Sequence, residues 1–461
     1  MERYDWGVTP PAVPGLDSES VARFFDADLT QIRLPTQSVR TAFGCNPLAL
    51  DSDAYIEQVA TKRAQLMSTF LRSVGMALGL PRADGAALSF EALAGDSHNG
   101  GRRPLLVHSA SASGSQVLKF ADPRPYLLLA AVLDEVSPAV GVDLRPPPIT
   151  ADPSHEWYLV PYLASRSLPY YELDQVMFSL GAVTAVAACL RMVDLHLENL
   201  LIVDGKPIII DPECILHCFD GENPADWLKA TGLIDREVHL SALRGGDVSR
   251  QPLFSCELRR RTDGVLDYRT PAKGFRNRVR EPSTCHLADP ADYREAVFAG
   301  YRLTHHFFVR HKGRIVELLA EMVDDDFRVR FLYRNTRHYA AVGQMLNLPT
   351  LFGSEFWRQG LFERFSHSAS FQPRPSRKAL AAEWKDLQVR DIPYFWVRAG
   401  ETAIRHRSGV VQRLARRQTL KADAINSILS MSHDDLGAQL AVLNDFFDRE
   451  PIAGEAKEHA A

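Results

Sequence analysis

The chain has 461 residues, of which 46% are hydrophobic and 24% are charged, and its formal net charge is −4. These proportions are those of a globular protein, and with so small a net charge we expect neither a nucleic-acid partner nor a membrane-surface partner. Six scattered cysteines argue against a disulfide framework and fit a reducing compartment. Because residues 1–15 lack a signal-peptide pattern, and the most apolar segment (176–193) is too short to span a bilayer, we expect a cytoplasmic protein in which that segment is a buried helix.

Hydrophobic periodicity and turn residues predict mixed secondary structure in the first half of the chain. The predicted elements are, in order, a helix over 54–79, a hairpin of 104–107 with 116–120, a helix over 125–136, a strand over 156–162, a helix over 173–192 and a second hairpin of 200–203 with 207–210. Asp204 and Gly205 separate the strands of the second hairpin, and Asp-Gly between β-branched runs is a strong hairpin signal.

The second half of the chain has a different pattern. Residues 240–290 are polar and basic and contain glycine and proline, which predicts a long mobile loop. Helical periodicity then dominates from residue 290 to about residue 450. Strands are thus expected in the first half and helices in the second, and this order favours the α+β class.

The densest polar cluster begins where the long apolar helix ends: it contains Asp194, His196, Glu198 and Asn199 and continues, after the second hairpin, with Asp211 and Glu213. Phosphoryl transfer needs a carboxylate that accepts the proton of the attacking hydroxyl, oxygen ligands for Mg²⁺ and a lysine for the phosphates of ATP. The order of helix, polar loop, hairpin and aspartate is that of a protein-kinase catalytic loop and metal-binding aspartate. Because Mg²⁺ takes few ligands from a protein, Asn199 and Asp211, with Glu213 nearby, would suffice.

Each of these residues also has a simpler interpretation. Polar residues after a helix often serve as caps and turn formers, although a set of six between apolar elements favours catalysis. Lys119, at the end of the first hairpin, is either the phosphate lysine or a solvated strand end. Residues 95–102 are rich in glycine and would suit a phosphate-covering loop. Residues 328–339 carry five cations, counting His338, which indicates an anion-binding face or a solvated basic helix.

Together these residues resemble the N-terminal dehydratase domain of class II lanthipeptide synthetases (LanM type). The core motif of that family is similar to the Asp194–Asn199 cluster followed by Gly205, Pro207, Asp211 and Glu213. Four further stretches resemble the family in the same order: the glycine loop at 95–102, Arg330 to Thr336 with Tyr339, Asp391 to Phe395, and residues 431–440. The resemblance covers roughly residues 85–447.

The resemblance implies a reaction in two stages. The family phosphorylates Ser or Thr of a precursor peptide with ATP and then eliminates phosphate, which gives dehydroalanine or dehydrobutyrine. The roles carried over by position are ATP-phosphate contact for Lys119, general base for Asp194, Mg²⁺ binding for Asn199, Asp211 and Glu213, membership of the shared active site for His196, Asp96 and His98, and phosphate departure for Arg330 and Thr336. Elimination needs a base for the α-proton and positive charge at the leaving phosphate, and these residues would supply both.

The sequence also departs from the family. Phe120 follows Lys119 where the family usually has proline, and Asn335 precedes Thr336 where it tends to have proline. No cysteine follows Cys285, whereas the cyclase of the family needs a long helical domain with a zinc site. We therefore expect a stand-alone dehydratase that does not close thioether rings by itself. Its expected partners are a precursor peptide with its leader and, where rings form, a separate cyclase.

The expected fold is α+β, with a divergent protein-kinase-like bilobal core and a helical C-terminal extension. The expected units are an irregular and helical segment over 1–84, a unit like the kinase N-lobe over 85–165, a unit like the C-lobe over 166–447 that includes an activation-loop-like insertion at about 217–290 and a helical phosphate-elimination region, and a tail over 448–461. Within the insertion, Arg259, Arg260 and Arg261 would either meet an acidic leader peptide or lie in a solvated loop.

Two other functions remain open from the sequence. A kinase without the elimination step, acting on a peptide or a small molecule, is consistent with the altered surroundings of Lys119. A non-catalytic subunit that binds the peptide for another enzyme is consistent with the missing cyclase. Turnover that depends on Mg-ATP and on Asp194 would exclude the non-catalytic subunit, and loss of phosphate from the product would exclude the kinase.

Overall fold

The structure is a computed structural model, and the description below concerns residues 10–26, 28–29, 49–79, 87–93, 97–108, 114–163, 173–196, 198–217, 224–234, 241–244, 248–249, 257–260, 266–269, 273–274, 289–346, 355–368, 373–415 and 418–449. Within these ranges the chain mixes helices and antiparallel sheets, as the predicted α+β class requires. None of the helices in these ranges combines the length and the apolar character that a membrane span needs.

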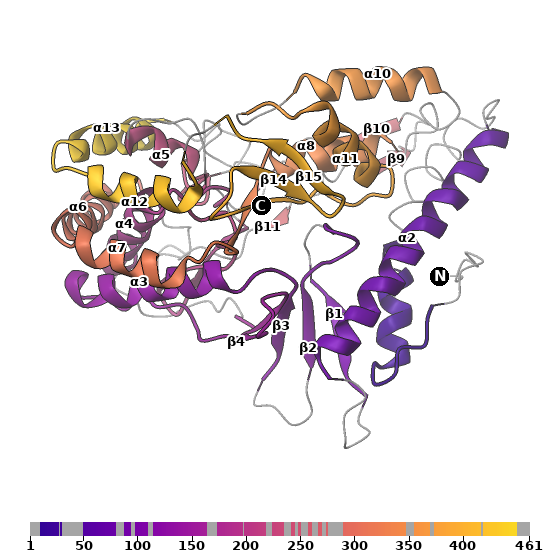
Figure 1. Cartoon of the computed structure of the whole chain (residues 1–461), viewed down its shortest axis with the longest axis horizontal. Coiled ribbons are helices and arrows are strands. Elements are labelled where there is room, and N and C mark those ends of the chain that lie inside the picture. The colour runs from indigo at the N-terminus through magenta and orange to yellow at the C-terminus, as the bar shows by residue number, and fades with distance from the viewer. Residues whose placement is uncertain are drawn as a thin grey trace, which may run out of the picture.

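The N-terminal part is built on a five-stranded antiparallel sheet. Its strand order is β1 (Ser89–Ala92), β2 (Leu105–His108), β3 (Gln116–Lys119), β5 (Tyr158–Pro161) and β4 (Thr150–Ala151). Alternate residues of β2 are buried, and they pack with apolar side chains of α2 (Ala49–Ala77), which runs along one side of the sheet in Figure 1. The predicted first hairpin, the helix over 54–79 and the strand over 156–162 are thereby confirmed.

The larger core is helical and lies on the other side of the molecule from α2 (Figure 1). It contains α3 (Arg124–Val140), α4 (Leu173–Cys189), α5 (Pro224–Ala230), α6 (Arg294–Arg310), α7 (Lys312–Met322), α12 (Leu420–Ser430) and α13 (Asp435–Phe447). Helix α4 is buried along nearly its whole length, which confirms the predicted buried helix. A Cβ atom at Gly181 would lie 1.9 Å from the Val297 carbonyl oxygen, and one at Gly300 would lie 1.9 Å from that of Phe178. Only glycine at both positions therefore allows α4 and α6 to cross this closely.

The second predicted hairpin is confirmed as β6 (Leu200–Val203) and β7 (Lys206–Ile209), which pair antiparallel. Asp204 and Gly205 form the turn, and both have positive φ angles, 49° and 74°. Such angles are those of a two-residue hairpin turn with left-handed backbone at both central positions. The hairpin carries the chain back from the end of the polar loop to Asp211.

Helices dominate the described part of the chain between residues 290 and 450, as predicted, but the prediction missed a sheet. A four-stranded antiparallel sheet lies in this region, in the order β12 (Arg328–Phe331), β13 (Phe395–Arg398), β14 (Ala403–His406) and β15 (Gly409–Arg413). The chain between β12 and β13 does contain α8 (Thr336–Met345), α10 (Glu355–Ser366) and α11 (Arg377–Leu387). Strands of four or five residues give too few repeats of the pleat for the pattern to be recognised, and the partner of β12 lies far along the chain.

The prediction of a long loop over 240–290 was also wrong in part. Strands β9 (Glu257–Arg260) and β10 (Leu266–Arg269) form one antiparallel pair, and β8 (Val248–Ser249) pairs with β11 (Lys273–Gly274). Arg259 and Arg260 belong to β9, whereas Arg261 lies outside the described residues. The charged side chains obscured these strands in the sequence, because a short strand whose side chains are mostly polar lacks the apolar alternation that identifies a strand.

Candidate active site

The loop after α4 is held in an unusual backbone conformation. Arg191 and Asp194 have φ angles of 50° and 64°, in the left-handed region that a residue other than glycine rarely adopts. The backbone N–H of Val193 donates to the Cys214 carbonyl (3.2 Å), and that of Leu195 donates to the Thr231 carbonyl (2.8 Å). These bonds hold Asp194 in a strained conformation, and such residues are concentrated at functional sites.

Asn199 connects the two ends of this loop. Its side-chain Nδ2 donates to the backbone carbonyl of Asp194 (2.8 Å). Its backbone carbonyl accepts from the backbone N–H of Ile210 (3.0 Å). The ring of His196 is fixed in the same turn, because its Nδ1 accepts from the N–H of Glu198 (3.2 Å). Asp194, His196 and Asn199 thus form one unit at the start of the β6–β7 hairpin.

Arg330 joins this loop from the four-stranded sheet. Its guanidinium donates to Glu213 (Nη1 to Oε1, 2.5 Å) and lies 3.9 Å from Asp194 Oδ2. Its backbone N–H also donates to the Glu213 carbonyl (2.8 Å), so β12 lies directly against the segment after β7. Burial works to lower the pKa of Arg330, but Glu213, together with Cys214, Asp194 and Tyr394, outweighs burial and raises that pKa well above its ordinary value. The site therefore contains a permanent buried cation.

Asp194 is a stronger base than an ordinary aspartate. Its removal from water raises the pKa of its carboxyl group, although the nearby His196 ring and the Arg330 guanidinium work in the opposite direction. A carboxylate of raised pKa accepts a proton more readily near neutral pH. This property suits the general-base role that the resemblance implies.

Tyr394 connects three of these groups. Its hydroxyl donates to Glu213 Oε2 (3.0 Å), its ring lies under the Arg330 guanidinium at 5.3 Å, and the His98 ring stacks on it at 5.0 Å. Burial raises the pKa of Tyr394 well above its ordinary value, and Glu213 adds to the effect, so the hydroxyl keeps its proton. Burial also lowers the pKa of His98, to about 4, which leaves that ring neutral near pH 7.

The glycine loop binds a carboxylate of the protein itself. Asp391, which is fully buried, accepts from the Ser97 hydroxyl (2.7 Å) and from the backbone N–H groups of Gly100 (2.6 Å) and Gly101 (3.1 Å). Arg63 of α2 lies 3.5 Å from the same carboxylate. The N–H groups of Gly100 and Gly101 are therefore already bonded to a carboxylate of the protein, and His98 of the same loop stacks on Tyr394.

Lys119 connects the five-stranded sheet with the end of the β6–β7 hairpin. Its ammonium group donates to the Ile210 carbonyl (2.6 Å) and lies 3.5 Å from Asp211 Oδ1. Lys119 is the last residue of β3, and Asp211 follows β7 by two positions. The two parts of the molecule therefore meet at this lysine and this aspartate, which the sequence analysis assigned to ATP and Mg²⁺.

The expected Mg²⁺ ligands fit the ion to different extents. The side-chain nitrogen of Asn199 donates to the Asp194 carbonyl, which leaves the side-chain oxygen of Asn199 outside that hydrogen bond. The Asp211 carboxylate is partly exposed. Both oxygens of Glu213 already have protein partners, Arg330 and Tyr394. Among the described residues, no three His, Cys, Asp or Glu side chains are grouped so that they could hold a metal ion. Two oxygen ligands nevertheless suit Mg²⁺, which usually takes one or two carboxylates and completes its shell with water and phosphate.

Two further residues, Asp96 and Thr336, were expected at the site. Asp96 lies outside the described residues. Thr336 begins α8, and within the described part of the chain its side chain makes no hydrogen bond to the residues above. Tyr394 and Asp391, in contrast, received no role from the sequence. The signal that marked them was their place in the stretch Asp391 to Phe395, which the sequence analysis quoted only as a family motif.

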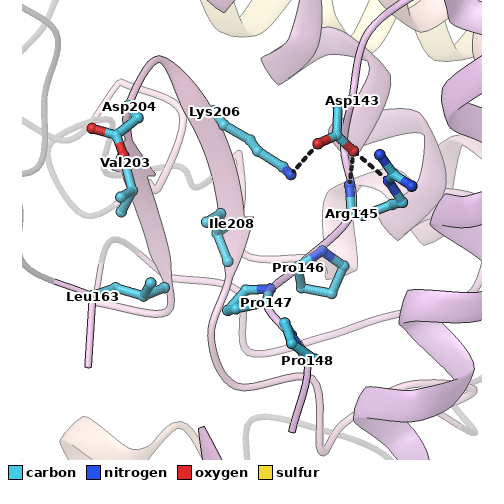
Figure 2. Close-up of a pocket in the computed structure, with 10 residues that line it drawn as sticks. All are labelled: Asp143, Arg145, Pro146, Pro147, Pro148, Leu163, Val203, Asp204, Lys206 and Ile208. Atoms are coloured by element: carbon cyan, nitrogen blue, oxygen red, sulfur yellow. Dashed lines mark hydrogen bonds and ion pairs between the residues drawn. The ribbon is translucent and has the colours of Figure 1, made fainter. Parts of the chain in front are cut away.

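A cavity of about 470 Å³ lies elsewhere, beside the tip of the β6–β7 hairpin. Figure 2 shows its lining: the segment with Asp143, Arg145 and three prolines on one side, and the hairpin with Val203, Lys206 and Ile208 on the other. Asp143 accepts from Arg145 (2.7 Å) and from Lys206 (2.9 Å), and these bonds hold the pKa of its carboxyl below the ordinary value. None of the expected catalytic residues lines this cavity.

Comparison with known proteins shows to which family the chain belongs. The chain belongs to the family described as a domain of unknown function, DUF4135, which matches residues 49–398. It is also similar to the lacticin 481/lactococcin biosynthesis protein LcnDR2 of Lactococcus lactis subsp. lactis, with 25% identity over 256 residues. That similarity covers 50% of this chain and 27% of the relative, so the chain matches about a quarter of the length of LcnDR2.

Proposed function

We propose that the protein is a peptide dehydratase of the lanthipeptide-synthetase type. It would phosphorylate Ser or Thr of a precursor peptide with ATP and then eliminate the phosphate. The observation that carries the proposal is the single cluster in which Arg330 lies between Asp194 and Glu213, because a base, a metal-side carboxylate and a leaving-group cation then share one site. The relationship to a lacticin 481 biosynthesis protein supports a peptide substrate.

In the first step, Asp194 accepts the proton of the substrate hydroxyl as the hydroxyl oxygen attacks the γ-phosphorus of ATP. The bond from that phosphorus to the bridging oxygen breaks, and ADP leaves with its electron pair. Lys119 would place a positive charge at the phosphates, and Asn199 and Asp211 would hold Mg²⁺, which would supply neutralisation of phosphate charge. The five-stranded sheet with α3 and the helical part around α4 correspond, in this proposal, to the two lobes of a divergent kinase. The contact of Lys119 with Asp211 is where such lobes would meet.

In the second step, the Cα–H bond and the Cβ–O bond of the phosphorylated residue break, and a Cα=Cβ double bond forms. A base takes the α-proton, and the phosphate leaves with the electron pair of the Cβ–O bond. Arg330 stabilises the negative charge on the departing phosphate, since a buried cation interacts more strongly than a solvated one. His98, which is neutral at pH 7, lies on the same tyrosine ring as Arg330 and is placed to take part in proton transfer.

Mass spectrometry of a precursor peptide encoded beside the gene, incubated with the protein and Mg-ATP, tests the proposal. We expect loss of one water per modified residue with the wild type and an unmodified peptide with Asp194→Asn. A product that retains phosphate would contradict the elimination step. Asp204→Asn, in the hairpin turn, is the matched substitution that should leave the reaction intact.

A second candidate is a kinase without elimination. The observation that favours it is the ion pair of Arg330 with Glu213, because a cation already paired with a carboxylate has less charge to offer a leaving phosphate. Under this alternative the phosphopeptide is the end product of the wild-type protein. Arg330→Ala would then leave the yield of phosphopeptide, relative to folded protein, unchanged.

A further inference from the structure

Two histidine rings from distant parts of the chain meet at the surface of the helical core. His306 lies near the end of α6, and His433 lies in the turn between α12 and α13. Their Nδ1 atoms are 3.0 Å apart, although 127 positions separate the two residues in the chain. Neither residue has a role in the proposed reaction, so the pair needs another explanation.

The helices beside the two rings are fastened together at their other ends. Arg294, the first residue of α6, donates to Asn444 (2.7 Å) and to Asp448 (2.7 Å) at the end of α13. Both helices lie at the left of the molecule in Figure 1. The end of α6 therefore lies beside the start of α13, where the turn with His433 leads into that helix.

Local contacts fix both rings. The backbone N–H and the hydroxyl of Ser432 both donate to Asp435 Oδ2, at 2.7 Å and 3.0 Å, and these bonds hold the turn that contains His433. The ring of His305, which is fully buried, packs edge to face against the ring of His306, with the ring centroids 6.2 Å apart. The fold itself thus brings the two Nδ1 atoms together, as a metal site requires of its ligands.

The spacing of the two nitrogens fits a single metal ion. Imidazole is the commonest side-chain ligand for metals, and at metal–nitrogen distances of about 2.0–2.1 Å two nitrogens 3.0 Å apart subtend an angle of about 95° at the ion. Tetrahedral ligands would lie about 3.4 Å apart instead. An angle of about 90° between nitrogen ligands, with oxygen in the other positions, is typical of Cu²⁺ and Ni²⁺. Because no metal-holding group of three His, Cys, Asp or Glu side chains occurs in the described ranges, water would complete the shell.

We propose that His306 and His433 form a two-histidine site for a divalent transition-metal ion of the Cu²⁺ or Ni²⁺ class, which joins the end of α6 to the start of α13. The two rings are together only in the folded chain, so the ion binds that state more tightly and stabilises it by mass action. The site uses none of the residues assigned to ATP or Mg²⁺, so it does not depend on the proposed function. A hydrogen bond from one ring to the other has the same length, and a metal titration distinguishes the two arrangements.

Thermal unfolding of the full chain, without a histidine tag and with or without NiCl₂, tests the proposal. Excess MgCl₂ in every sample competes for carboxylate sites such as Asp211. We expect Ni²⁺ to raise the Tm of the wild type by about 2 °C or more and to leave the Tm of His306→Asn and of His433→Asn unchanged. Calorimetric titration should show that each variant binds Ni²⁺ at least about tenfold more weakly, since loss of even an outer-shell partner costs about 10–100-fold.

His367→Asn is the matched control. It removes an exposed histidine directly after α10, a helix that lies away from α6 and α12 in Figure 1, and it should respond to Ni²⁺ like the wild type. The double variant of His306 and His433 should respond like either single variant, because both rings hold the same ion. An equal rise in Tm in the wild type and both single variants would overturn the proposal, as would a rise lost in only one of them. No rise in the wild type would overturn it too, and would mean that the two rings share only a hydrogen bond.

Discussion

The side chain of Arg330 donates to that of Glu213 at 2.5 Å although 117 positions separate the two residues in the chain. This ion pair joins the four-stranded sheet to the segment that follows the β6–β7 hairpin, and both side chains are buried. Asp194 lies 3.9 Å from the same guanidinium. One cation therefore balances two carboxylates.

Replacing Arg330 with alanine should destabilise the fold as well as change the reaction. Two buried carboxylates would lose their cation, and breaking a buried ion pair in this way costs about 3–5 kcal/mol. Urea unfolding followed by circular dichroism measures the change in the free energy of unfolding. Arg145→Ala is the control, because Arg145 is 59% exposed and pairs with Asp143 at 2.7 Å, so its loss should change the free energy of unfolding far less. Similar losses in the two variants would contradict the account of Arg330 as a buried counter-ion.

Lys119→Met should weaken the affinity for Mg-ATP. The ammonium group next to Asp211 would be lost, and with it the positive charge assigned to the phosphates. We expect the KM for ATP to rise about tenfold or more, which corresponds to one charge-assisted hydrogen bond. Lys206→Met removes a lysine that also bonds an aspartate (2.9 Å to Asp143) but lies at the hairpin tip, and its KM should stay at the wild-type value. An unchanged KM in Lys119→Met would exclude Lys119 from nucleotide binding.

Because burial keeps the ring of His98 neutral, we expect the folded protein to lose stability in acid. Burial lowers the pKa of His98 to about 4 in the folded protein, whereas the pKa of His98 in the unfolded chain is about 6.5. The unfolded state therefore binds more protons between these values, so the stability contributed by neutral His98 is present above about pH 6.5 and is lost as the pH falls toward 4. We expect the free energy of unfolding to fall by about 2 kcal/mol. This is less than the full pKa shift would give, because the His98 ring is partly exposed.

The measurement for His98 is the pH dependence of urea unfolding in the wild type and in His98→Asn. The variant should show a shallower decline with falling pH, because asparagine does not titrate in this range. Identical pH profiles for the two proteins would show that His98 does not gain a proton on unfolding.

Asp391 should control the rigidity of the glycine loop. In Asp391→Asn, the N–H groups of Gly100 and Gly101 lose a charged acceptor and Arg63 loses a counter-ion. Amide hydrogen exchange should then become faster at both glycines, and the free energy of unfolding should fall by about 2 kcal/mol or more. Asp134→Asn, at a side chain that is 63% exposed, is the matched control. Protection of Gly100 and Gly101 that is unchanged in Asp391→Asn would mean that the carboxylate does not hold the loop.

The parts that the sequence predicted are those in which neighbouring residues carry the signal. Asp194 and Asn199 lie within one loop, and the Asp204–Gly205 turn brings Asp211 back beside them, so local pattern was enough to assemble this half of the site. Lys119 was identified for the same reason, as the end of a predicted strand.

The rest of the site depends on long-range pairing. Residues 328–331 suggested a basic helix or an anion-binding face, because the strand that they pair with begins at Phe395. The burial of Arg330 against Glu213 is a consequence of that pairing and is not visible in either segment alone. The glycine loop was misinterpreted for a related reason: its anion is the carboxylate of Asp391, about 290 residues further along the chain.

The most direct test of the central claim is mass spectrometry of a precursor peptide encoded beside the gene, after incubation with Mg-ATP and either the wild type or Arg330→Lys. Lysine keeps the positive charge beside Glu213, which protects the fold, but it lacks the guanidinium N–H groups that would bind the leaving phosphate. The account predicts dehydrated peptide from the wild type and accumulated phosphopeptide from Arg330→Lys. Phosphopeptide as the end product of both proteins would contradict the account and make the protein a kinase.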